Sequence, residues 1–168
     1  ILVEDEEAEI IISDILRTYL PDALKRVSII PVGAANVVNM FEELYQQKKI
    51  PFKVVGIVDA DQPELKPALK LPGSHSPEEQ IITDISEKNL WHLLVGFLGN
   101  DVVIIKREFE QIRTIINHKE WLQKLAEKFN VSKIILWSQL SSIWVRNCTT
   151  NEQVNVILEE IKGRLSPN

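Results

Sequence analysis

Apolar residues form short continuous runs and helical stripes in turn over the first 60 residues. Ile1–Val3, Val27–Val32 and Lys53–Asp59 are β-branched runs of strand length, and the centre of the third, VVGIV, is apolar as in a strand buried on both faces. Between them, Glu6–Tyr19 has the spacing of an amphipathic helix, and Asn36 is a plausible N-cap for a second one. This order predicts a parallel α/β sheet with right-handed crossovers, flanked by helices.

Beyond residue 60 the pattern changes to helical stripes. Gln62–His75 holds three prolines and a glycine and is predicted to be a loop. Ser76, Pro77 and Glu79 then have the order of N-cap, first helical residue and third-position acid that opens a helix, which continues to about residue 99. Val102–Lys106 (VVIIK) is a candidate fourth strand. Further helices are predicted at Phe109–Ile116, His118–Phe129, Ser132–Val145 and Thr150–Leu165, the last with a capping box of Thr150 and Gln153.

These elements predict two regions. An α/β core is expected over residues 1–106, with a helical insertion at about 76–99, and a helical C-terminal region over residues 107–168. The chain starts inside a strand and without Met, so we expect it to be one piece of a longer polypeptide.

Composition narrows the class of protein without choosing a function. Hydrophobic residues make up 45% and charged residues 26%, as in ordinary globular proteins. No apolar run is long enough to cross a bilayer, so we expect no membrane partner. No stretch resembles a signal peptide, so we expect a cytoplasmic location. Cys148 is the only cysteine, which excludes an internal disulfide and a cysteine-rich zinc site. Trp121, Trp137 and Trp144 are expected in a core or an interface, and a homo-oligomer is a further expectation.

The charge balance is acidic, with 24 acids against 19 bases and a net charge of −5. This argues against a basic clamp that would bind nucleic acid by itself. A nuclease stays open, because a carboxylate cluster draws its positive charge from bound metal.

Acids follow two of the predicted strands. Glu4 and Asp5 follow the first strand, Gly33 follows the second, and Asp59 and Asp61 follow the third. The carboxyl ends of parallel strands meet at one edge of a sheet, where ligands bind. Carboxylates two residues apart on an extended segment point to the same side and can share a divalent cation. The alternative is a solvated turn in which Asp is the turn former.

One class that fits these acids is the signalling receiver domain. Glu4–Asp5 would be the acidic pair of such a domain, Asp59 its phosphate acceptor, and Lys106 the lysine that follows its fifth strand. Against this class, the gap before Asp59 is longer than usual, and Arg107 rather than proline follows the lysine. A receiver also has no use for Asp61 or for about 60 further helical residues.

The order of the motifs also resembles the TOPRIM domain, a Rossmann-like fold with Glu after strand one, Gly after strand two and DxD after strand three. Here ILVE ends at Glu4, IIPVG ends at Gly33, and GIVDAD contains Asp59 and Asp61. More specifically, the chain is similar to the TOPRIM region of the overcoming-lysogenization-defect (OLD) nucleases and their anti-phage relatives, in which an LPG…PE segment like LPGSHSPEE follows the DxD. The resemblance covers roughly residues 1–80, and the helical remainder matches only in character.

The resemblance implies a metal-dependent DNA endonuclease that nicks or cleaves DNA with Mg²⁺ or Mn²⁺, two ions being expected. It implies DNA as substrate and an ATP-binding-cassette-type ATPase domain upstream of Ile1, in anti-phage defence. A catalytically silent TOPRIM-like scaffold is the remaining alternative.

The resemblance also implies roles for individual residues, by their positions in the matching motifs. Glu4 would be a metal ligand and the general base, and Asp59 and Asp61 would hold the metal ions. Glu78 is expected among the catalytic residues and Glu79 among the metal ligands, near the second metal. Glu79 also has a sufficient structural explanation, as the capping-box partner of Ser76 at the start of the helix.

Two further features bear on this expected site. Lys106 would neutralise a phosphate in the transition state, the alternative being a strand-end lysine in solvent. The chain departs from the family at Asp5, where a Gly is usual, and at Ala8, where another acid is frequent. The ligands of the second metal therefore stay open.

Overall fold

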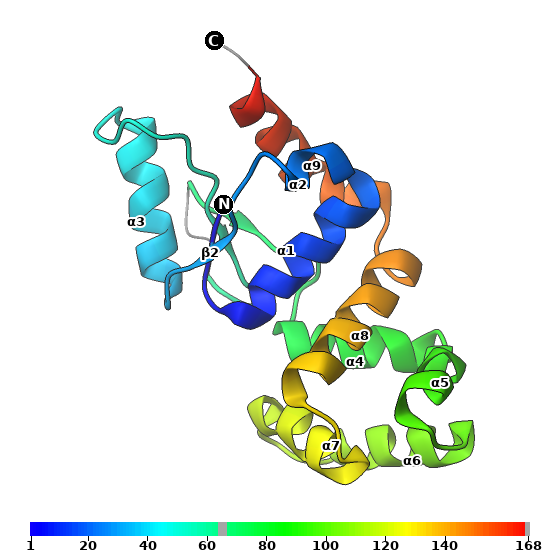
Figure 1. Cartoon of the computed structure of the whole chain (residues 1–168). Helices are drawn as coiled ribbons and strands as arrows, with labels where there is room; N and C mark the ends of the chain where they lie inside the picture. Colours follow the sequence, from blue (N-terminus) through cyan, green and yellow to red (C-terminus); the bar gives the residue numbers. More distant parts are fainter. Residues whose placement is uncertain (64–66, 167–168) are drawn as a thin grey trace. The chain divides into compact units, whose positions relative to one another are not determined.

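The computed structural model describes residues 1–63 and 67–166, which divide into two compact units (Figure 1). Ile1–Pro77 and Thr149–Asn168 form one, named here the α/β unit, and Glu78–Cys148 form the other, named the helical unit. These units differ from the regions expected from sequence. The expected boundary after residue 106 falls inside a helix, α6 (Val102–Ile112), and the last helix belongs to the α/β unit.

Four short strands lie at the centre of the α/β unit among the described residues: β1 (Leu2–Val3), β2 (Ile30–Pro31), β3 (Ile57–Val58) and β4 (Leu69–Lys70). β1 pairs with β2 and β3 with β4, both in parallel, and a parallel bridge between Leu2 and Gly56 joins the two pairs. The spatial order is therefore β2-β1-β3-β4. A mostly helical α/β fold with parallel strands is thus confirmed.

The strands are shorter than the apolar runs that predicted them. In Val27–Val32, Ile30 is 48% exposed and Pro31 has no N–H to donate, as is typical of an edge strand. β4 lies in the segment after residue 61 that was predicted to be a loop, and this prediction was wrong for β4. The Leu69 N–H donates to the Gly56 carbonyl at 2.8 Å, so pairing with a neighbouring strand outweighs the turn-forming composition around it.

Helix α1 (Glu6–Tyr19) has the bounds that its apolar stripe predicted. Asp5 is its N-cap, accepting a hydrogen bond from the Ala8 N–H at 2.9 Å. The acid that departs from the resembled family therefore has a structural role at a helix start. A four-residue helix, α2 (Pro21–Leu24), follows at once.

Helix α3 (Ala35–Gln46) starts earlier than predicted. Its N-cap is Ala34, which makes no side-chain hydrogen bond, so the prediction of Asn36 as the cap was wrong. The Glu4 carboxylate from the end of β1 instead accepts a hydrogen bond from the Ala35 N–H. A side chain distant in sequence thus satisfies a donor that an N-cap normally satisfies.

Helix α9 (Asn151–Leu165) opens with the predicted capping box. The Thr150 N–H donates to Gln153 Oε1 at 2.8 Å, and the Gln153 N–H donates to Thr150 Oγ1 at 3.4 Å. The helix packs against α1 and α2.

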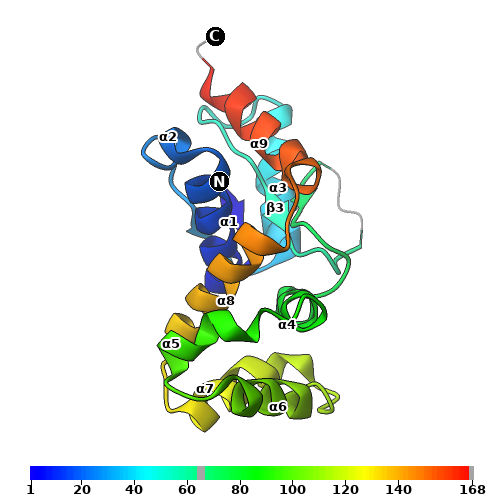
Figure 2. The same ribbon diagram turned by 90° about the vertical axis from the view of Figure 1, so that its right-hand side faces the viewer.

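The helices α1 and α3 lie on opposite sides of the strands (Figure 2). The buried apolar side of α1 consists of Ala8, Ile11, Ile12, Ile15 and Leu16. The buried cluster beneath α3 consists of Leu2, Ala35, Val38, Val54 and Val58. The strand that leads into β3 approaches α3 closely at Gly56, where an added Cβ would lie 3.0 Å from Val38 Cγ1.

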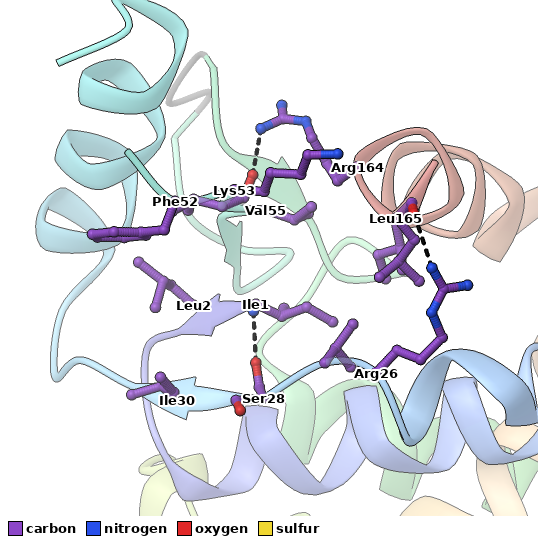
Figure 3. Close-up of a pocket in the computed structure, with 13 residues that line it drawn as sticks. Ile1, Leu2, Arg26, Ser28, Ile30, Phe52, Lys53, Val55, Arg164 and Leu165 are labelled. Carbon is purple, nitrogen blue, oxygen red and sulfur yellow. Dashed lines mark hydrogen bonds between the residues drawn. The ribbon is translucent and has the colours of Figure 1, made fainter. Parts of the chain in front are cut away.

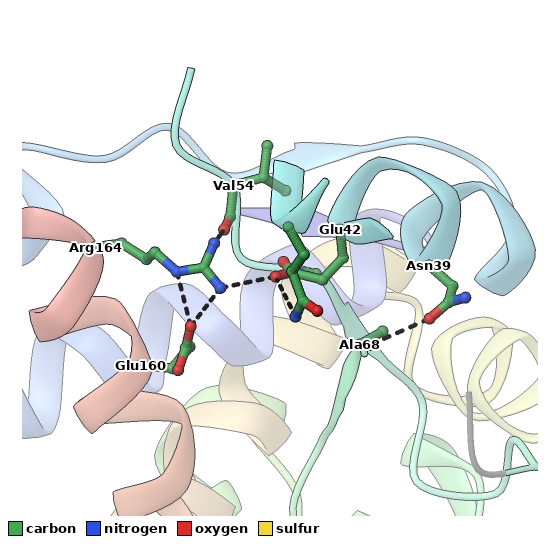
Figure 4. A network of polar contacts seen from close by, with 8 residues as sticks. Asn39, Glu42, Val54, Ala68, Glu160 and Arg164 are labelled. Atoms are coloured by element: carbon green, nitrogen blue, oxygen red, sulfur yellow. Dashed lines mark hydrogen bonds and ion pairs between the residues drawn. The ribbon is translucent and has the colours of Figure 1, made fainter. Parts of the chain in front are cut away.

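A buried carboxylate connects α3 to both β3 and α9 (Figure 4). Glu42 of α3 is 2% exposed. Its Oε2 accepts a hydrogen bond from the Gly56 N–H at 2.8 Å, and its Oε1 accepts one from Arg164 Nη2 of α9 at 2.8 Å. Glu42 therefore contacts all three elements. Removal of Arg164 would leave its buried charge uncompensated, so the ion pair is expected to stabilise their packing.

The Arg164 guanidinium has three further partners. It donates to the Val54 carbonyl and, at 2.7 Å, to Glu160, and it lies 4.1 Å from the centre of the Tyr45 ring. Burial by itself would lower the pKa of Arg164, but the hydrogen bonds and charges of Glu42 and Glu160 more than offset this and raise the pKa. The side chain therefore stays cationic within the α/β unit.

The helical unit consists of α4 (Pro77–Glu87), η1 (Leu90–Leu94), α5 (Val95–Leu98), α6 (Val102–Ile112), η2 (His118–Glu120), α7 (Trp121–Phe129) and α8 (Lys133–Asn147). The prediction of a strand at Val102–Lys106 was wrong, because this segment begins α6. Asp101 caps the helix, accepting from the Val103 N–H at 2.8 Å. Ile105 and Phe109 are buried while Val103 is 70% exposed, which is a helical rather than an alternating pattern.

Aromatic rings fill the core of the helical unit. Phe109 lies between Trp91 and Phe129, with ring centroids 4.7 and 6.1 Å away. The Trp144 Nε1–H donates to Asp84 at 2.6 Å. The prediction that Trp121, Trp137 and Trp144 lie in a core or an interface is confirmed for the core, since all three are buried. Over the described residues, no helix has the length and apolar character needed to cross a membrane.

Candidate functional site

The acids predicted at two strand ends meet at one edge of the α/β unit. Glu4 directly follows β1, and Asp59 directly follows β3. Glu4 Oε1 accepts a hydrogen bond from the Asp59 N–H at 2.8 Å. Gly33, two residues after the end of β2, donates its N–H to the Glu4 carbonyl at 2.7 Å. Its φ of +95° is readily adopted only by glycine. The three strand ends therefore converge on Glu4, as predicted.

The environment of Glu4 raises the pKa of its carboxyl group above the ordinary value of 4.5. Burial is the largest cause, and the charges of Asp5 and Asp61 act in the same direction. Hydrogen bonds from the backbone N–H groups of Asp59 and Ala35 oppose the shift. The influence of Asp5 and Asp61 indicates that negative charge accumulates around this carboxylate, which is the condition that a bound cation would relieve.

The loop after β3 brings one residue that sequence reasoning missed. Asp61 is exposed and Gln62 is half-buried. The Gln62 Nε2–H donates to Glu4 Oε2 at 3.4 Å, and the Gln62 N–H donates to the Asp59 carbonyl at 3.3 Å, closing a turn. The signal was present in VDADQ, where a long amide side chain stands three residues after the first aspartate. Its partner could be identified only from the fold.

The remaining predicted site residues belong to the helical unit. Glu78 and Glu79 lie in the first turn of α4 and are half-buried. Lys106 is exposed within α6, with its Nζ 3.7 Å from Glu110 Oε1 one turn further along. The receiver hypothesis requires a lysine at the end of a strand, and Lys106 lies within a helix instead. The roles of Glu78, Glu79 and Lys106 in catalysis or metal binding stay predictions.

The acids at this edge have the right chemistry for a hard divalent cation, since carboxylate oxygens are the ligands that Mg²⁺ and Mn²⁺ prefer. Among residues 1–63 and 67–166, however, no group of three or more His, Cys, Asp or Glu side chains is placed to hold a metal ion. Both oxygens of Glu4 instead accept hydrogen bonds. The donors therefore fit the cation by type, but in this arrangement they are not assembled into a ligand set.

A cavity of about 340 Å³ lies at the other end of the strands, at their amino ends (Figure 3). Its walls are mostly apolar, and its three charged lining side chains are all basic: Arg26, Lys53 and Arg164. The first two donate to backbone carbonyls of the last turn, Arg26 to Leu165 at 2.9 Å and Lys53 to Ser166 at 2.8 Å. None of the predicted site residues lines this cavity.

Comparison of the chain with family models, with curated proteins and with solved structures finds no match.

Proposed function

We propose that the α/β unit is a TOPRIM-type, divalent-cation-dependent phosphodiesterase domain that acts as a DNA endonuclease. The observation that carries this proposal is the meeting of Glu4 with the Asp59–Gln62 turn at the carboxyl ends of parallel strands. This is the edge at which α/β folds bind ligands. The raised pKa of Glu4, caused first by burial and then by Asp5 and Asp61, adds support, because it reflects negative charge gathered at that edge.

Each acid has a role in this proposal. Glu4, Asp59 and Asp61 are the residues that would hold Mg²⁺ or Mn²⁺. A bound cation of this kind lowers the pKa of a coordinated water and stabilises the leaving oxygen of a phosphodiester. Glu4 would take the proton of that water, a role that is favoured by the rise of its carboxyl pKa on burial. Its Oε1 accepts a hydrogen bond from the Asp59 N–H at 2.8 Å and its Oε2 a longer one from Gln62 at 3.4 Å, so Oε2 would be the oxygen that takes the proton.

The resemblance to the OLD nucleases supplies the wider context of the proposal. It includes DNA as substrate, an ATP-binding-cassette-type ATPase domain as partner and a role in anti-phage defence, and the cytoplasmic location expected from the sequence is compatible with these. The acidic character of the α/β unit supports a substrate that is bound through a cation rather than through basic side chains alone.

The proposal is tested by Mn²⁺ titration of the 168-residue chain, followed by electron paramagnetic resonance, and by incubation with supercoiled plasmid and Mn²⁺. We expect saturable binding and plasmid nicking, both abolished by Asp59→Ala. Asp22→Asn is the matched control, because Asp22 is an exposed aspartate of the same unit, in the first turn of α2. Absence of Mn²⁺ binding in a folded chain would contradict the proposal, and labelling of Asp59 by acetyl phosphate would favour a receiver instead.

One observation favours a second candidate function, a catalytically silent scaffold. Glu4 connects β1 to the start of α3 and to the turn after β3, through hydrogen bonds from Ala35, Asp59 and Gln62. Hydrogen bonds of this kind, made by a half-buried carboxylate, stabilise the fold without any metal. If Glu4→Gln leaves no change in Mn²⁺ binding but lowers the melting temperature, the scaffold is the better description.

A further inference from the structure

The cavity at the amino ends of the strands has an apolar end and a basic end. Figure 3 shows Phe52, Leu2 and Ile30 at one end, and the charged groups of Arg26 and Lys53 at the other, beside α9. Its volume of about 340 Å³ is within the range of cavities that bind small organic ligands. Phe52 is 52% exposed and Ile30 is 48% exposed, although both are large apolar side chains. By size and lining, the cavity therefore suits a ligand with an apolar body.

The basic end has hydrogen-bond donors to spare. Arg26 and Lys53 are exposed, and each donates to one backbone carbonyl at the end of α9. A guanidinium and an ammonium each carry several N–H donors, so both side chains can serve a further acceptor. Within residues 1–63 and 67–166 neither forms an ion pair with a carboxylate, although acids outnumber bases in the α/β unit. The basic end therefore has the charge and the donors to bind an anionic group.

The surroundings of the basic end favour a single negative charge on that group. The last carbonyls of α9 lie there, and the C-terminal end of a helix carries partial negative charge. The third basic residue of the lining, Arg164, is already bonded to Glu42. A phosphate dianion would therefore have only Arg26 and Lys53 to offset its charge, whereas a carboxylate carries one charge and two oxygens that accept hydrogen bonds.

We propose that this cavity binds an aliphatic monocarboxylate. The carboxylate accepts hydrogen bonds from Arg26 and Lys53, and the chain packs against Leu2 and Phe52 at the apolar end. The site lies at the opposite end of the strands from Glu4, so the proposal does not depend on cation binding or on DNA cleavage. Because the two basic residues also hold the end of α9, a bound carboxylate stabilises the folded α/β unit.

The test is a titration of the 168-residue chain with octanoate, with octanol as the uncharged analogue, followed by calorimetry and by ¹H–¹⁵N nuclear magnetic resonance. We expect saturable octanoate binding, about tenfold tighter than that of octanol, because only the carboxylate accepts charge-assisted hydrogen bonds. Amide shifts should be centred on Val55 and Ile161, which line the cavity, and the melting temperature should rise. An increase in ionic strength from about 0.05 M to about 0.5 M should remove most of the difference between the two ligands.

Two pairs of variants separate the basic end from the apolar end. Lys53→Gln should weaken octanoate binding about fivefold and leave octanol binding unchanged, because it removes one charged donor. Lys25→Gln is the matched control, since this exposed lysine of the same unit does not line the cavity. Phe52→Ala should weaken the binding of both ligands about fivefold through lost apolar contact. Met40→Ala, at a side chain that is 46% exposed outside the cavity, should weaken neither.

The possible results decide the proposal. Absence of saturable octanoate binding to the folded chain overturns it, and so does equal affinity for octanoate and octanol. Displacement of octanoate by inorganic phosphate at a similar concentration overturns the preference for a monocarboxylate. Loss of both ligands in Lys53→Gln assigns that lysine to holding α9 and overturns its role in binding the carboxylate. Tighter octanoate binding that Lys53→Gln and Phe52→Ala each weaken, with both control variants unchanged, supports the proposal.

Discussion

The two units differ in how they distribute charge. The helical unit contains nine acidic and nine basic residues, so the α/β unit carries the whole net charge of −5. In the helical unit, acids and bases pair with one another, within α6 between Lys106 and Glu110 at 3.7 Å and between α7 and α6 through Lys128 and Glu108 at 3.2 Å. In the α/β unit, acids gather at the edge that holds Glu4, and the first turn of α1 adds Glu6, Glu7 and Glu9.

The difference indicates where chemistry is to be expected. Paired charges on a helix surface contribute little to stability, and their opposite signs largely cancel in the electrostatic potential around the unit. A one-signed cluster at a sheet edge attracts cations and repels DNA phosphates. If the α/β unit cuts DNA, cation binding should therefore precede DNA binding.

The two units also differ in the interactions that stabilise them. The largest change in the free energy of unfolding is expected for a substitution in the aromatic core of the helical unit. Phe109 is fully buried between Trp91 and Phe129, so Phe109→Ala should cost about 4 kcal/mol through lost burial and a cavity. Urea unfolding measures the cost, and hydrogen exchange should locate the lost protection in Glu78–Cys148. Ile116→Ala is the control, because Ile116 is 100% exposed. Equal loss of protection throughout α1 and α3 would show that the units do not open separately.

Arg164→Ala should destabilise the α/β unit by about 3 kcal/mol, because it leaves the buried Glu42 carboxylate without its cationic partner. Hydrogen exchange should now increase in α9, α3 and β3 rather than in the helical unit. Arg146→Ala, at an exposed arginine of α8, should change the free energy of unfolding by less than about 0.5 kcal/mol. If the two variants are equally stable, the ion pair does not stabilise the unit.

A pair of glycines tests the close contact between β3 and α3. Gly56→Ala should cost about 2 kcal/mol, since its Cβ would meet Val38 Cγ1 at 3.0 Å and the Val38 carbonyl at 3.2 Å. Gly163→Ala in α9 meets nothing within 4 Å and should stabilise the protein by about 0.5 kcal/mol, because alanine favours helix. Opposite signs in thermal melts are the expected result, and a neutral Gly56→Ala would contradict the contact.

The smallest effect is a difference in pH dependence between two glutamates. The raised pKa of Glu4 means that the folded state binds its proton more tightly, so this contribution to stability is present below pH 4.5 and is lost as pH rises through the folded pKa. Hydrogen bonds from Arg107, opposed by burial and assisted by Lys128, lower the pKa of Glu108. Its contribution is present above pH 4.5 and is lost as pH falls through the folded pKa.

Urea titrations from pH 3 to pH 7 measure both contributions. Glu4→Gln should remove a decrease in stability with rising pH, and Glu108→Gln should remove an increase. The same slope change in both variants would contradict the two assignments.

Local patterns predicted those elements that local interactions determine. The stripe in Glu6–Tyr19 and the capping box at Thr150 depend on residues within one or two turns, and both are found as predicted. The segment Val102–Lys106 was predicted wrongly because four consecutive apolar residues suit a strand or a helix, and only the burial of Ile105 and Phe109 on one face distinguishes them.

The candidate site was predictable only in part. The meeting of Glu4 with Asp59 follows from parallel topology, which the order of the elements implies. The contact from Gln62 depends on one turn, and the start of α3 depends on a carboxylate from another strand. Neither leaves a periodic signal in the sequence.

The hydrogen bond between Arg164 and Glu42 joins residues 122 positions apart and has a consequence for folding kinetics. The α/β unit cannot complete its core during synthesis until its last helix has left the ribosome. The helical unit is one continuous segment of the chain, Glu78–Cys148, so it is expected to fold earlier and to shorten the loop that remains to be closed. We therefore expect the last folding phase to report docking of α9, and Arg164→Ala to slow or abolish that phase while leaving the faster phase unchanged.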